Sequence, residues 1–401
     1  MKSLFLLVLS FLFAFQSHAQ EGSQWRGPNR DGKYPAKNLL KKWPESGPKL
    51  LWHYDDLGDG HASAAVTDTR IYTAGVDGEQ GFVIAFDYSG KQLWKTNYAK
   101  EWLENYDGVR GTPLLDDGML YIMSGHGELV AISAENGEKV WSKNMLTEYG
   151  GRNLRFGMTE NLLIEGDKIF CTPGGEEINI IALNKKTGDL IWKTKANGEK
   201  SAYCSPLLVK LANRSLMVTH TANSIVGVDT QNGEMMWRFE HKNQYNIHPN
   251  TPLYKDGLLF CFSGYGKGGV MLQLTEDGSS VKELWRNASV DNQMGGAVLV
   301  DGKIYVSGHN NRMWFCLDWK TGQEIYSSKA LAKGNVIFAD GMLYCYGDNG
   351  EIGLVDVKAG AFNKVSSFRV PYGSKQHWAH LVIHKNRMYV RHGNAFMVYE
   401  I

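Results

Sequence analysis

Hydrophobic residues occur along this chain in short runs, each bounded by a turn. In one stretch, residues 114–115 precede a turn at 116–118, and apolar runs follow at 119–123, 128–133 and 138–141. The Asp-Gly dipeptide in this turn favours the positive φ angles that a tight hairpin needs. Runs of this length between such turns are typical of strands rather than helices. The stretch therefore predicts four short antiparallel strands.

An eleven-residue phrase recurs within this pattern. It reads Ala-Ile-Ser-Ala-Glu-Asn-Gly-Glu-Lys-Val-Trp at 131–141, returns at 182–192 and 227–237, and has a shorter copy at 85–94. Eight aromatic residues end these copies and their degenerate relatives: Trp52, Trp94, Trp141, Trp192, Trp237, Trp285, Tyr326 and Phe368. They are 41 to 51 residues apart, which is the length of one four-stranded propeller blade.

The two ends of the chain predict how the ring closes. Three apolar runs follow Phe368, near 379–383, 388–391 and 396–401, but no fourth. The run 49–54 has no partner before it, so it can complete an eighth blade and remove the exposed sheet edges. We expect an all-β fold, an eight-bladed propeller of four-stranded antiparallel blades over 49–401. The preceding segment, 20–48, should lie extended as a strap against the side of the ring.

Residues 1–19 resemble an export signal. Lys2 provides a positive start, residues 4–15 are apolar except for one serine, and Ser-His-Ala at 17–19 is a small-x-small cleavage site. The apolar core is shorter than the roughly 20 residues of a membrane span. We expect cleavage after Ala19, no transmembrane segment in the mature chain, and a periplasmic or secreted protein. Because no cysteine follows the site, we expect no lipid anchor there.

Charge and cysteine content narrow the classes of function. The chain has 43 Lys+Arg and 42 Asp+Glu, a formal net charge of +1, without runs of like charge. This pattern argues against nucleic acid as a partner. Cys171, Cys261 and Cys345 occupy equivalent positions in different repeats, so we expect buried free thiols. No CxxC or Cys/His cluster in the sequence suggests zinc, and no metal site is predicted.

The phrase at 131–141 and its copies resemble the docking repeat of quinoprotein propellers, the PQQ-like repeat superfamily, over roughly residues 44–401. In that family the tryptophan packs between blades, so the resemblance implies a structural role for the eight aromatic residues. The motif Trp-Arg-Gly-Pro-Asn-Arg-Asp-Gly at 25–32, with 110–113, 263–269 and 378–380, resembles a group of exported bacterial members. That group is similar to BamB-type propellers, which implies a binding scaffold without a cofactor. The lipid-attachment cysteine of BamB is missing here.

Propeller topology predicts where a site lies. The loops that enter the first strand of each blade, and those between its second and third strands, open on one face, here called the loop face. The candidate ligand-binding residues entering first strands are Arg110, Arg155, Glu160, Tyr203, His248, Asn250, Gln293, Asn335, His377, Trp378 and His380. His61, Asn161, Cys204, Met294 and Gln376 are their neighbours, and the second-to-third-strand loops add His126, Glu176, Glu177, Tyr265, Lys267, His309 and Asn310.

Two interpretations of these residues remain open. The arginines could bind carboxylate or phosphate, and the aromatic rings could stack on a sugar or planar ring. Polar side chains at a wet channel mouth equally need no ligand. The interpretation that we favour is a binding or scaffolding module without bound PQQ, whose partner is a small polar or anionic ligand or an envelope protein. The long loops 97–109 and 143–158 are rich in aromatic residues and could meet such a partner.

Two enzymatic alternatives accompany it. The resemblance implies a PQQ-dependent oxidoreductase, whose calcium ion could use Glu160–Asn161 and Asp291–Asn292. The chain lacks the adjacent cysteine pair of many such alcohol dehydrogenases and the CxxCH motif of haem attachment. An enzyme acting on a carbohydrate or another small polar substrate could instead use His248, His377, His380 and Glu160 as acids or bases.

Overall fold

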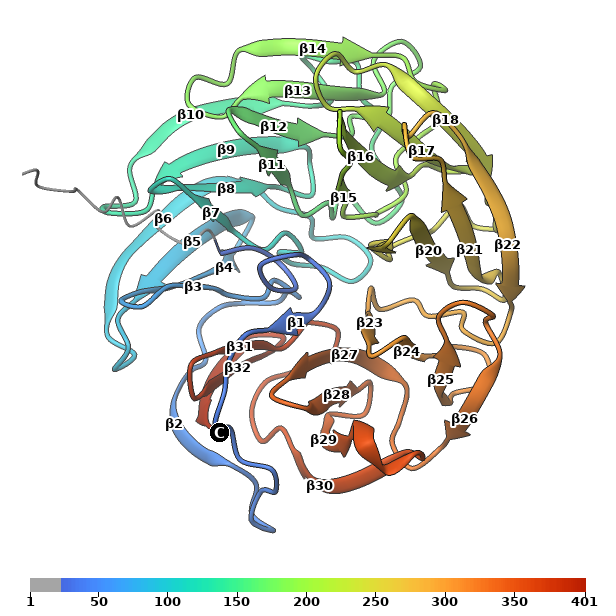
Figure 1. Ribbon diagram of the computed structural model, residues 1–401. Helices are drawn as coiled ribbons and strands as arrows, with labels where there is room; N and C mark the ends of the chain where they lie inside the picture. Colours follow the sequence, from blue (N-terminus) through green and yellow to red (C-terminus); the bar gives the residue numbers. More distant parts are fainter. Residues whose placement is uncertain (1–22) are drawn as a thin grey trace, which may run out of the picture.

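The computed structural model describes residues 23–401. Eight β-sheets stand in a ring around a central channel (Figure 1), so the predicted eight-bladed all-β propeller is confirmed. The helical structure in the described residues is one 3-10 turn, η1 (Val357–Ala359). No helix in residues 23–401 is long and apolar enough to cross a bilayer.

In each blade the strands run antiparallel from the channel to the rim (Figure 1). Blade 1 comprises β3 (Ala65–Val66), β4 (Ile71–Asp77), β5 (Gln80–Phe86) and β6 (Gln92–Lys100). Blade 2 comprises β7 (Leu114–Asp116), β8 (Met119–Met123), β9 (Glu128–Ser133) and β10 (Lys139–Asn144). Blades 3 and 4 comprise β11 (Leu163–Glu165), β12 (Lys168–Cys171), β13 (Ile180–Asn184), β14 (Leu190–Thr194), and β15 (Leu207–Lys210), β16 (Ser215–His220), β17 (Ser224–Asp229), β18 (Met235–Glu240).

The second half of the ring repeats this arrangement. Blades 5 and 6 comprise β19 (Leu253–Lys255), β20 (Leu258–Ser263), β21 (Gly268–Leu274), β22 (Val281–Asn287), and β23 (Ala297–Val300), β24 (Lys303–Ser307), β25 (Trp314–Asp318), β26 (Glu324–Ser328). Blade 7 comprises β27 (Gly334–Ala339), β28 (Met342–Gly347), β29 (Glu351–Asp356) and β30 (Asn363–Arg369). Blade 8 comprises β31 (Val382–His384), β32 (Arg387–His392), β33 (Ala395–Glu400) and, from the start of the chain, β2 (Lys49–Tyr54).

The ring closes through β2, as the unpartnered run at 49–54 predicts. This strand pairs antiparallel with β33, and Trp52 lies opposite Val398. The first and last parts of the chain therefore share one sheet, in which β2 covers the edge that β33 would otherwise expose.

The aromatic residues on the outer strands pack against glycines of the next blade. A Cβ added to Gly188 would lie 2.9 Å from the Trp141 ring, so only glycine allows this approach. The Trp141 indole N–H also donates to the carbonyl oxygen of Lys185 at 3.0 Å. The same packing joins Trp52 to Gly90, Trp94 to Gly137, Trp192 to Gly233, Trp285 to Gly322 and Phe368 to Gly47. The structural role predicted for these aromatic residues is confirmed at these positions.

A second set of contacts joins all eight blades close to the channel. Side chains just before the first strand of a blade bond to the neighbouring blade, and we call this ring of bonds the inner girdle. Its links are Ser63–Thr112, Thr112–Asn161, Asn161–Ser205, Ser205–Thr251, Asn250–Asn292, Asn292–Gly334, Asn335–Ala379 and His380–Ser63. Each link satisfies buried polar groups that would otherwise destabilise the fold.

Residues 23–36 do not lie against the side of the ring, so the expected strap is wrong for this part of the N-terminal segment. Ser23 exchanges two backbone hydrogen bonds with Leu115 on β7, at 3.1 and 2.8 Å. Residues 33–34 form β1 (Lys33–Tyr34), which pairs in parallel with the innermost strand β27. The segment thus runs along the channel side of blades 2 and 7, near the centre of Figure 1. We call residues 23–36 the N-terminal plug.

Two buried arginines hold the plug in place. Arg30 donates to the carbonyl oxygens of Asn161 and Leu162, both at 2.6 Å. Arg26 donates to the carbonyl oxygens of Val336 and Ala297 and to a ring nitrogen of His380. Channel-lining strands leave carbonyl groups that need donors, and a guanidinium supplies several donors in one rigid fork. Hydrogen bonds from Arg26 and Arg30 therefore hold this segment in the channel. The composition of the segment did not predict these bonds.

Glycine is required inside the plug. Gly32 has φ +76°, and a Cβ there would lie 2.4 Å from Nη2 of Arg26. Arg26 is 1% exposed and Arg30 2%, and burial lowers the pKa of each guanidinium to about 10. Both stay charged at neutral pH. The predicted export signal and the cleavage after Ala19 lie outside the described residues.

Candidate functional site

Several candidate residues belong to the inner girdle. Asn250 donates to the carbonyl oxygens of Phe262 and Asn292, and its own oxygen accepts from the N–H of Gly295 at 2.8 Å. Asn335 donates to Ala379, and His380 bonds to Arg26 and to the carbonyl oxygen of Met294. These three side chains are buried. Their hydrogen-bonding capacity is used mainly to join blades and hold the plug.

Two other candidates pack against neighbouring loops. His377 stacks on His392 with ring centroids 3.6 Å apart, and its Nδ1 lies 2.7 Å from the Tyr346 hydroxyl. Burial, with a smaller effect from His392, lowers the pKa of His377 to about 4. Gln293 covers Gly264, where an added Cβ would meet Cγ of the glutamine at 2.2 Å. Neither residue lines either of the cavities described below.

Four aromatic residues from different loops form a continuous row on the loop face, here called the aromatic arc. Ring centroids are 5.0 Å apart for Trp378 and Tyr106, 5.7 Å for Tyr106 and Phe156, and 6.1 Å for Phe156 and Tyr203. Tyr106 is 47% exposed. The arc contains two predicted residues, Tyr203 and Trp378, and two from the loops predicted to be rich in aromatic residues.

The arc is held rigidly by its backbone and by Arg110. Tyr106 and Tyr203 adopt left-handed φ angles of 56° and 68°, which are strained for bulky residues. Arg110 donates to the carbonyl oxygens of Asn105, Tyr106 and Phe156, so its guanidinium ties two loops together instead of facing an anion. The exposed Arg155 lies over the Phe156 ring, 5.4 Å from its centroid.

Glu160 occupies a different place, below the arc. Its carboxylate accepts from the backbone N–H and the hydroxyl of Thr172, both at 3.0 Å. Burial raises the pKa of Glu160 to about 7, although Thr172 and Arg30 act in the opposite direction. The adjoining cavity, which Tyr203, Cys204 and His220 also line, has a volume of about 10 Å³. That volume suits a single water molecule at most.

Three buried histidines meet at the boundary of blades 4 and 5. His220 ends β16, His241 follows β18, and His248 lies in the loop that leads to β19. One nitrogen of each ring lies within 4.8 Å of the others. Burial, the largest cause in each case, lowers the pKa of His241 to about 2 and of His248 to about 4, and that of His220 well below its usual value. Sequence analysis singled out only His248.

The signal that could have united the three histidines is topological. The end of a second strand, the end of a fourth strand and the following loop all reach the loop face in a propeller blade. His220, His241 and His248 occupy those three places within one repeat. Their separation along the chain hides this relationship, because it does not match the short ligand spacings of common zinc motifs.

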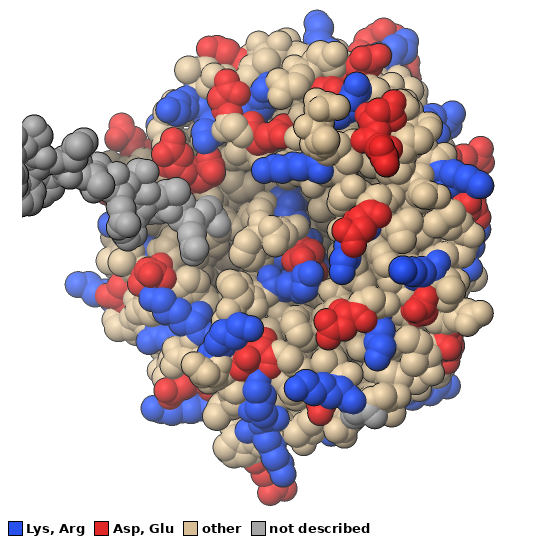
Figure 2. Space-filling model, in the orientation of Figure 1, with Lys and Arg blue, Asp and Glu red and all other residues tan. Residues whose placement is uncertain are grey.

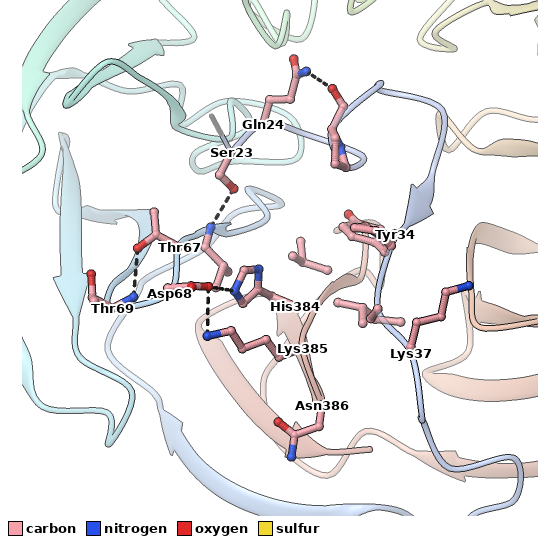
Figure 3. A pocket seen from close by; sticks show the side chains of 17 residues that line it. Ser23, Gln24, Tyr34, Lys37, Thr67, Asp68, Thr69, His384, Lys385 and Asn386 are labelled. Carbon is pink, nitrogen blue, oxygen red and sulfur yellow. Dashed lines mark hydrogen bonds and ion pairs between the residues drawn. The ribbon is translucent and has the colours of Figure 1, made fainter. Parts of the chain in front are cut away.

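A larger cavity of about 960 Å³ lies on the opposite face, between blades 1 and 8 and the plug (Figure 3). The turns 67–69 and 384–386 form part of its wall, with Tyr34 and Lys37 from the N-terminal segment. Asp68 points toward His384 and Lys385, at 2.9 and 3.0 Å, across the boundary between the blades (Figure 3). Sequence analysis did not predict this concave surface, because the plug supplies part of its wall.

Charges of both signs are scattered over the face drawn in Figure 2, which is also hollowed beside its centre. No single sign dominates this face, in agreement with the net charge of +1. This face therefore carries no extended basic patch of the kind that marks a nucleic-acid-binding surface.

Comparison with known proteins identifies the family. The family described as "Outer membrane protein assembly factor BamB" matches residues 38–158, 79–297 and 159–366 in overlapping segments. The chain belongs to this family. Its members share the PQQ-like repeat that builds the blades described above, so the resemblance seen in the repeats is confirmed.

Relatives of this BamB-family propeller include quinoprotein dehydrogenases and outer membrane protein assembly factors. The quinoprotein alcohol dehydrogenase PedH of Pseudomonas putida is 24% identical over 261 residues, 61% of this chain and 42% of the dehydrogenase. The outer membrane protein assembly factor BamB of Shewanella oneidensis is 25% identical over 280 residues, 66% of this chain and 63% of that protein. The chain thus spans less than half the length of PedH and slightly less than two thirds of that BamB.

Solved structures show the same fold. BamB from Moraxella catarrhalis superposes with a TM-score of 0.63 at 15% identity, covering 88% of this chain and all of BamB. A europium-containing methanol dehydrogenase superposes with a TM-score of 0.68 at 13% identity, covering 92% of this chain and 89% of the dehydrogenase. At these identities the likeness establishes the fold and leaves the activity to the residues of the site.

The four predicted calcium ligands, Glu160, Asn161, Asp291 and Asn292, already have hydrogen-bond partners within the fold. The Asp291 carboxylate accepts from the backbone N–H groups of Gly266, His309 and Asn310 at 2.7 to 3.1 Å. The side-chain amides of Asn161 and Asn292 each donate and accept hydrogen bonds within the fold, and both bond to a neighbouring blade. Beside Glu160, a cavity of about 10 Å³ contrasts with the roughly 300–1,000 Å³ of ordinary ligand pockets. The predicted calcium ligands are therefore used to shape loops and join blades.

Proposed function

We propose that this protein is a binding propeller of the cell envelope, and that its aromatic arc docks an extended segment of a protein partner without bound PQQ. The observation that carries the proposal is the continuous row of Trp378, Tyr106, Phe156 and Tyr203 on the loop face. Aromatic residues and arginine are enriched at protein interfaces because they combine large apolar area with polar edges.

The rigidity of the arc supports this function. Strained backbone at Tyr106 and Tyr203 persists only where the surroundings enforce it, and such strain clusters at functional sites. A preorganised row of rings loses little conformational entropy on binding. Four consecutive neighbouring rings suit an extended chain better than a compact ligand. The family relationship to outer membrane protein assembly factors supports a protein partner and a location in the cell envelope.

Site-specific photo-crosslinking tests the proposal. A photoreactive residue replaces Tyr106 in one variant and Val140 in a control, in cells that produce the protein. Val140 is 52% exposed on the outer strand β10, away from the loop face. We expect a defined protein adduct from position 106 only, and its loss when Phe156→Ala and Trp378→Ala are combined. Identical adducts from both positions, or none from position 106, would contradict the proposal.

The oxidoreductase alternative has its own test. Purified protein is titrated with PQQ and calcium, and binding is followed by tryptophan fluorescence and by absorbance of the quinone. We expect no stoichiometric binding at micromolar concentrations, because Glu160, Asn161 and Asp291 are engaged within the fold. Stoichiometric binding with dye reduction by an alcohol or sugar would place the oxidoreductase function first.

A further inference from the structure

The three histidines at the boundary of blades 4 and 5 present unpaired nitrogens to one another. His220 and His248 are stacked with centroids 5.3 Å apart, and His241 lies 5.5 Å from His220 and 5.8 Å from His248. His241 and His248 are fully buried and His220 is 1% exposed. The cluster is therefore shielded from water, so a ring nitrogen without a protein partner there has little solvent to bond to.

The outward contacts determine which nitrogens remain free. Nε2 of His248 lies 3.1 Å from the carbonyl oxygen of Ala222, and a carbonyl oxygen can only accept, so Nε2 carries the proton. Nε2 of His241 bonds to the Ser263 hydroxyl at 3.3 Å. Nδ1 of both residues and both nitrogens of His220 are buried without a partner. At least two lone pairs, on His248 and His220, thus have no donor to accept from.

This arrangement matches the environment of histidines that bind metal ions. A ligating histidine commonly donates its second ring N–H to a backbone carbonyl or a polar side chain, which orients the ring and fixes its tautomer. His248 and His241 make such contacts with Ala222 and Ser263. Buried neutral imidazoles suit Zn²⁺ and related divalent ions, and three histidines with one open position form a common zinc site.

We propose that His220, His241 and His248 bind one Zn²⁺ ion through their free ring nitrogens, with water in the fourth position. In tetrahedral geometry at Zn–N distances of about 2.0–2.1 Å, the nitrogens would stand about 3.4 Å apart. One nitrogen of each ring already lies within 4.8 Å of the others, so zinc binding would require the rings to rotate and close this remaining gap. His220 also borders the small cavity beside Glu160, from which the water enters.

The surrounding charges are mixed. Lys267 and Arg286 lower the pKa of His241, and Lys267 also lowers the pKa of His248, which Glu199 raises.

The proposed zinc site does not depend on the aromatic arc, so its failure would leave the proposed binding function in place. Its ligands come from two strand ends and a loop, so bound zinc would cross-link blades 4 and 5.

The test uses untagged full-length protein stripped with chelator and titrated with Zn²⁺, and with Co²⁺ as a spectroscopic probe. We expect one equivalent of Zn²⁺, visible bands of four-coordinate Co²⁺, and a higher melting temperature with zinc. His220→Gln and His241→Gln should abolish the stoichiometric uptake, whereas the control His53→Gln should retain it. His53 lies on β2, stacked on Tyr372, far along the chain from the cluster.

Two outcomes would overturn the proposal. One is the absence of stoichiometric uptake by the unmodified protein, which would mean that the histidines share internal hydrogen bonds or water instead. The other is uptake that the His220→Gln and His241→Gln variants retain. If these variants do not fold, X-ray absorption of the zinc-loaded unmodified protein decides, because the proposal requires three imidazole ligands at the metal.

Discussion

The guanidinium of Arg26 in the N-terminal plug lies 3.0 Å from Nδ1 of His380 in blade 8, and Nε2 of the same imidazole lies 2.7 Å from the carbonyl oxygen of Met294. Arginine can only donate, so Nδ1 accepts and Nε2 carries the proton. His380 must therefore be neutral in the folded protein. Burial and the neighbouring Arg26 hold its pKa well below the usual value.

This relationship predicts that the protein loses stability in mild acid. Burial lowers the pKa of His248 to about 4 and of His61 to about 3, whereas the unfolded residues titrate near 6.5. The stabilisation is complete above about pH 6.5 and is lost as the pH falls toward 4, by up to about 1.4 kcal/mol per pH unit for each fully buried histidine. The pKa of Glu160 is raised to about 7, so this residue favours the folded state as the pH falls from 7 toward the unfolded pKa of the carboxyl group. The buried histidines with lowered pKa values are more numerous, so their effect should dominate.

Urea unfolding at pH 7 and pH 5 with chelator present measures this effect. We expect a lower free energy of unfolding at pH 5. The variant His380→Gln keeps an acceptor and a donor but cannot titrate, so its pH dependence should be smaller than that of the unmodified protein. Equal stability at the two pH values would show that the buried histidines do not control acid stability.

The plug should contribute strongly to stability through Arg30. Arg30→Ala leaves the carbonyl oxygens of Asn161 and Leu162 without their charged donor. Because hydrogen bonds to charged groups contribute about 1.5–3 kcal/mol each, we expect a loss of about 3 kcal/mol or more in chemical denaturation. The control Arg155→Ala removes an exposed guanidinium and should change stability by less than about 0.5 kcal/mol. Equal denaturation midpoints would indicate that the plug is not bound in the channel in solution.

The contact between Trp141 and Gly188 should be measurable with a matched glycine. Gly188 and Gly118 have φ angles of +76° and +75°, but an added Cβ meets Trp141 only at Gly188 and nothing within 4 Å at Gly118. Both alanine substitutions cost about 1–2 kcal/mol for the left-handed backbone. Gly188→Ala should cost about 1–3 kcal/mol more, from overpacking between blades. Thermal and urea unfolding of the two variants measure this difference in the free energy of unfolding. Equal losses of stability in the two variants would argue against docking of the Trp141 ring on Gly188.

The cysteines should be unreactive in the native protein. Cys171, Cys204, Cys261, Cys316 and Cys345 are all buried and free. Burial also raises the pKa of Cys204 to about 11, which leaves little of the reactive thiolate at neutral pH. We expect a colorimetric thiol reagent to modify none of the five rapidly before denaturation and all five afterwards. Rapid native labelling of Cys171, Cys261 or Cys345 would show that the blade register is wrong.

The repeat by itself determined the ring. Docking of Trp141 on Gly188 needs only residues that lie within consecutive repeats, so the spacing of tryptophan and glycine predicts eight blades. The strand β2 was equally predictable, because an unpartnered run at the start matches a missing strand at the end. Both inferences rest on local patterns, since a blade buries its apolar faces only against its neighbours.

Only the tertiary structure decided what the polar residues near the channel do. From the sequence, Asn250, Asn335 and His380 could equally bind a ligand or join blades, because residue type does not reveal the hydrogen-bond partner. Partners of Asn250 and Asn335 lie in neighbouring blades, 42 to 45 residues away along the chain, and Arg26 lies 354 residues from His380. Folding within one repeat brings His220, His241 and His248 together from two strand ends and the loop that follows. Both kinds of site depend on distances in the folded ring or blade, which residue type and spacing along the chain do not give.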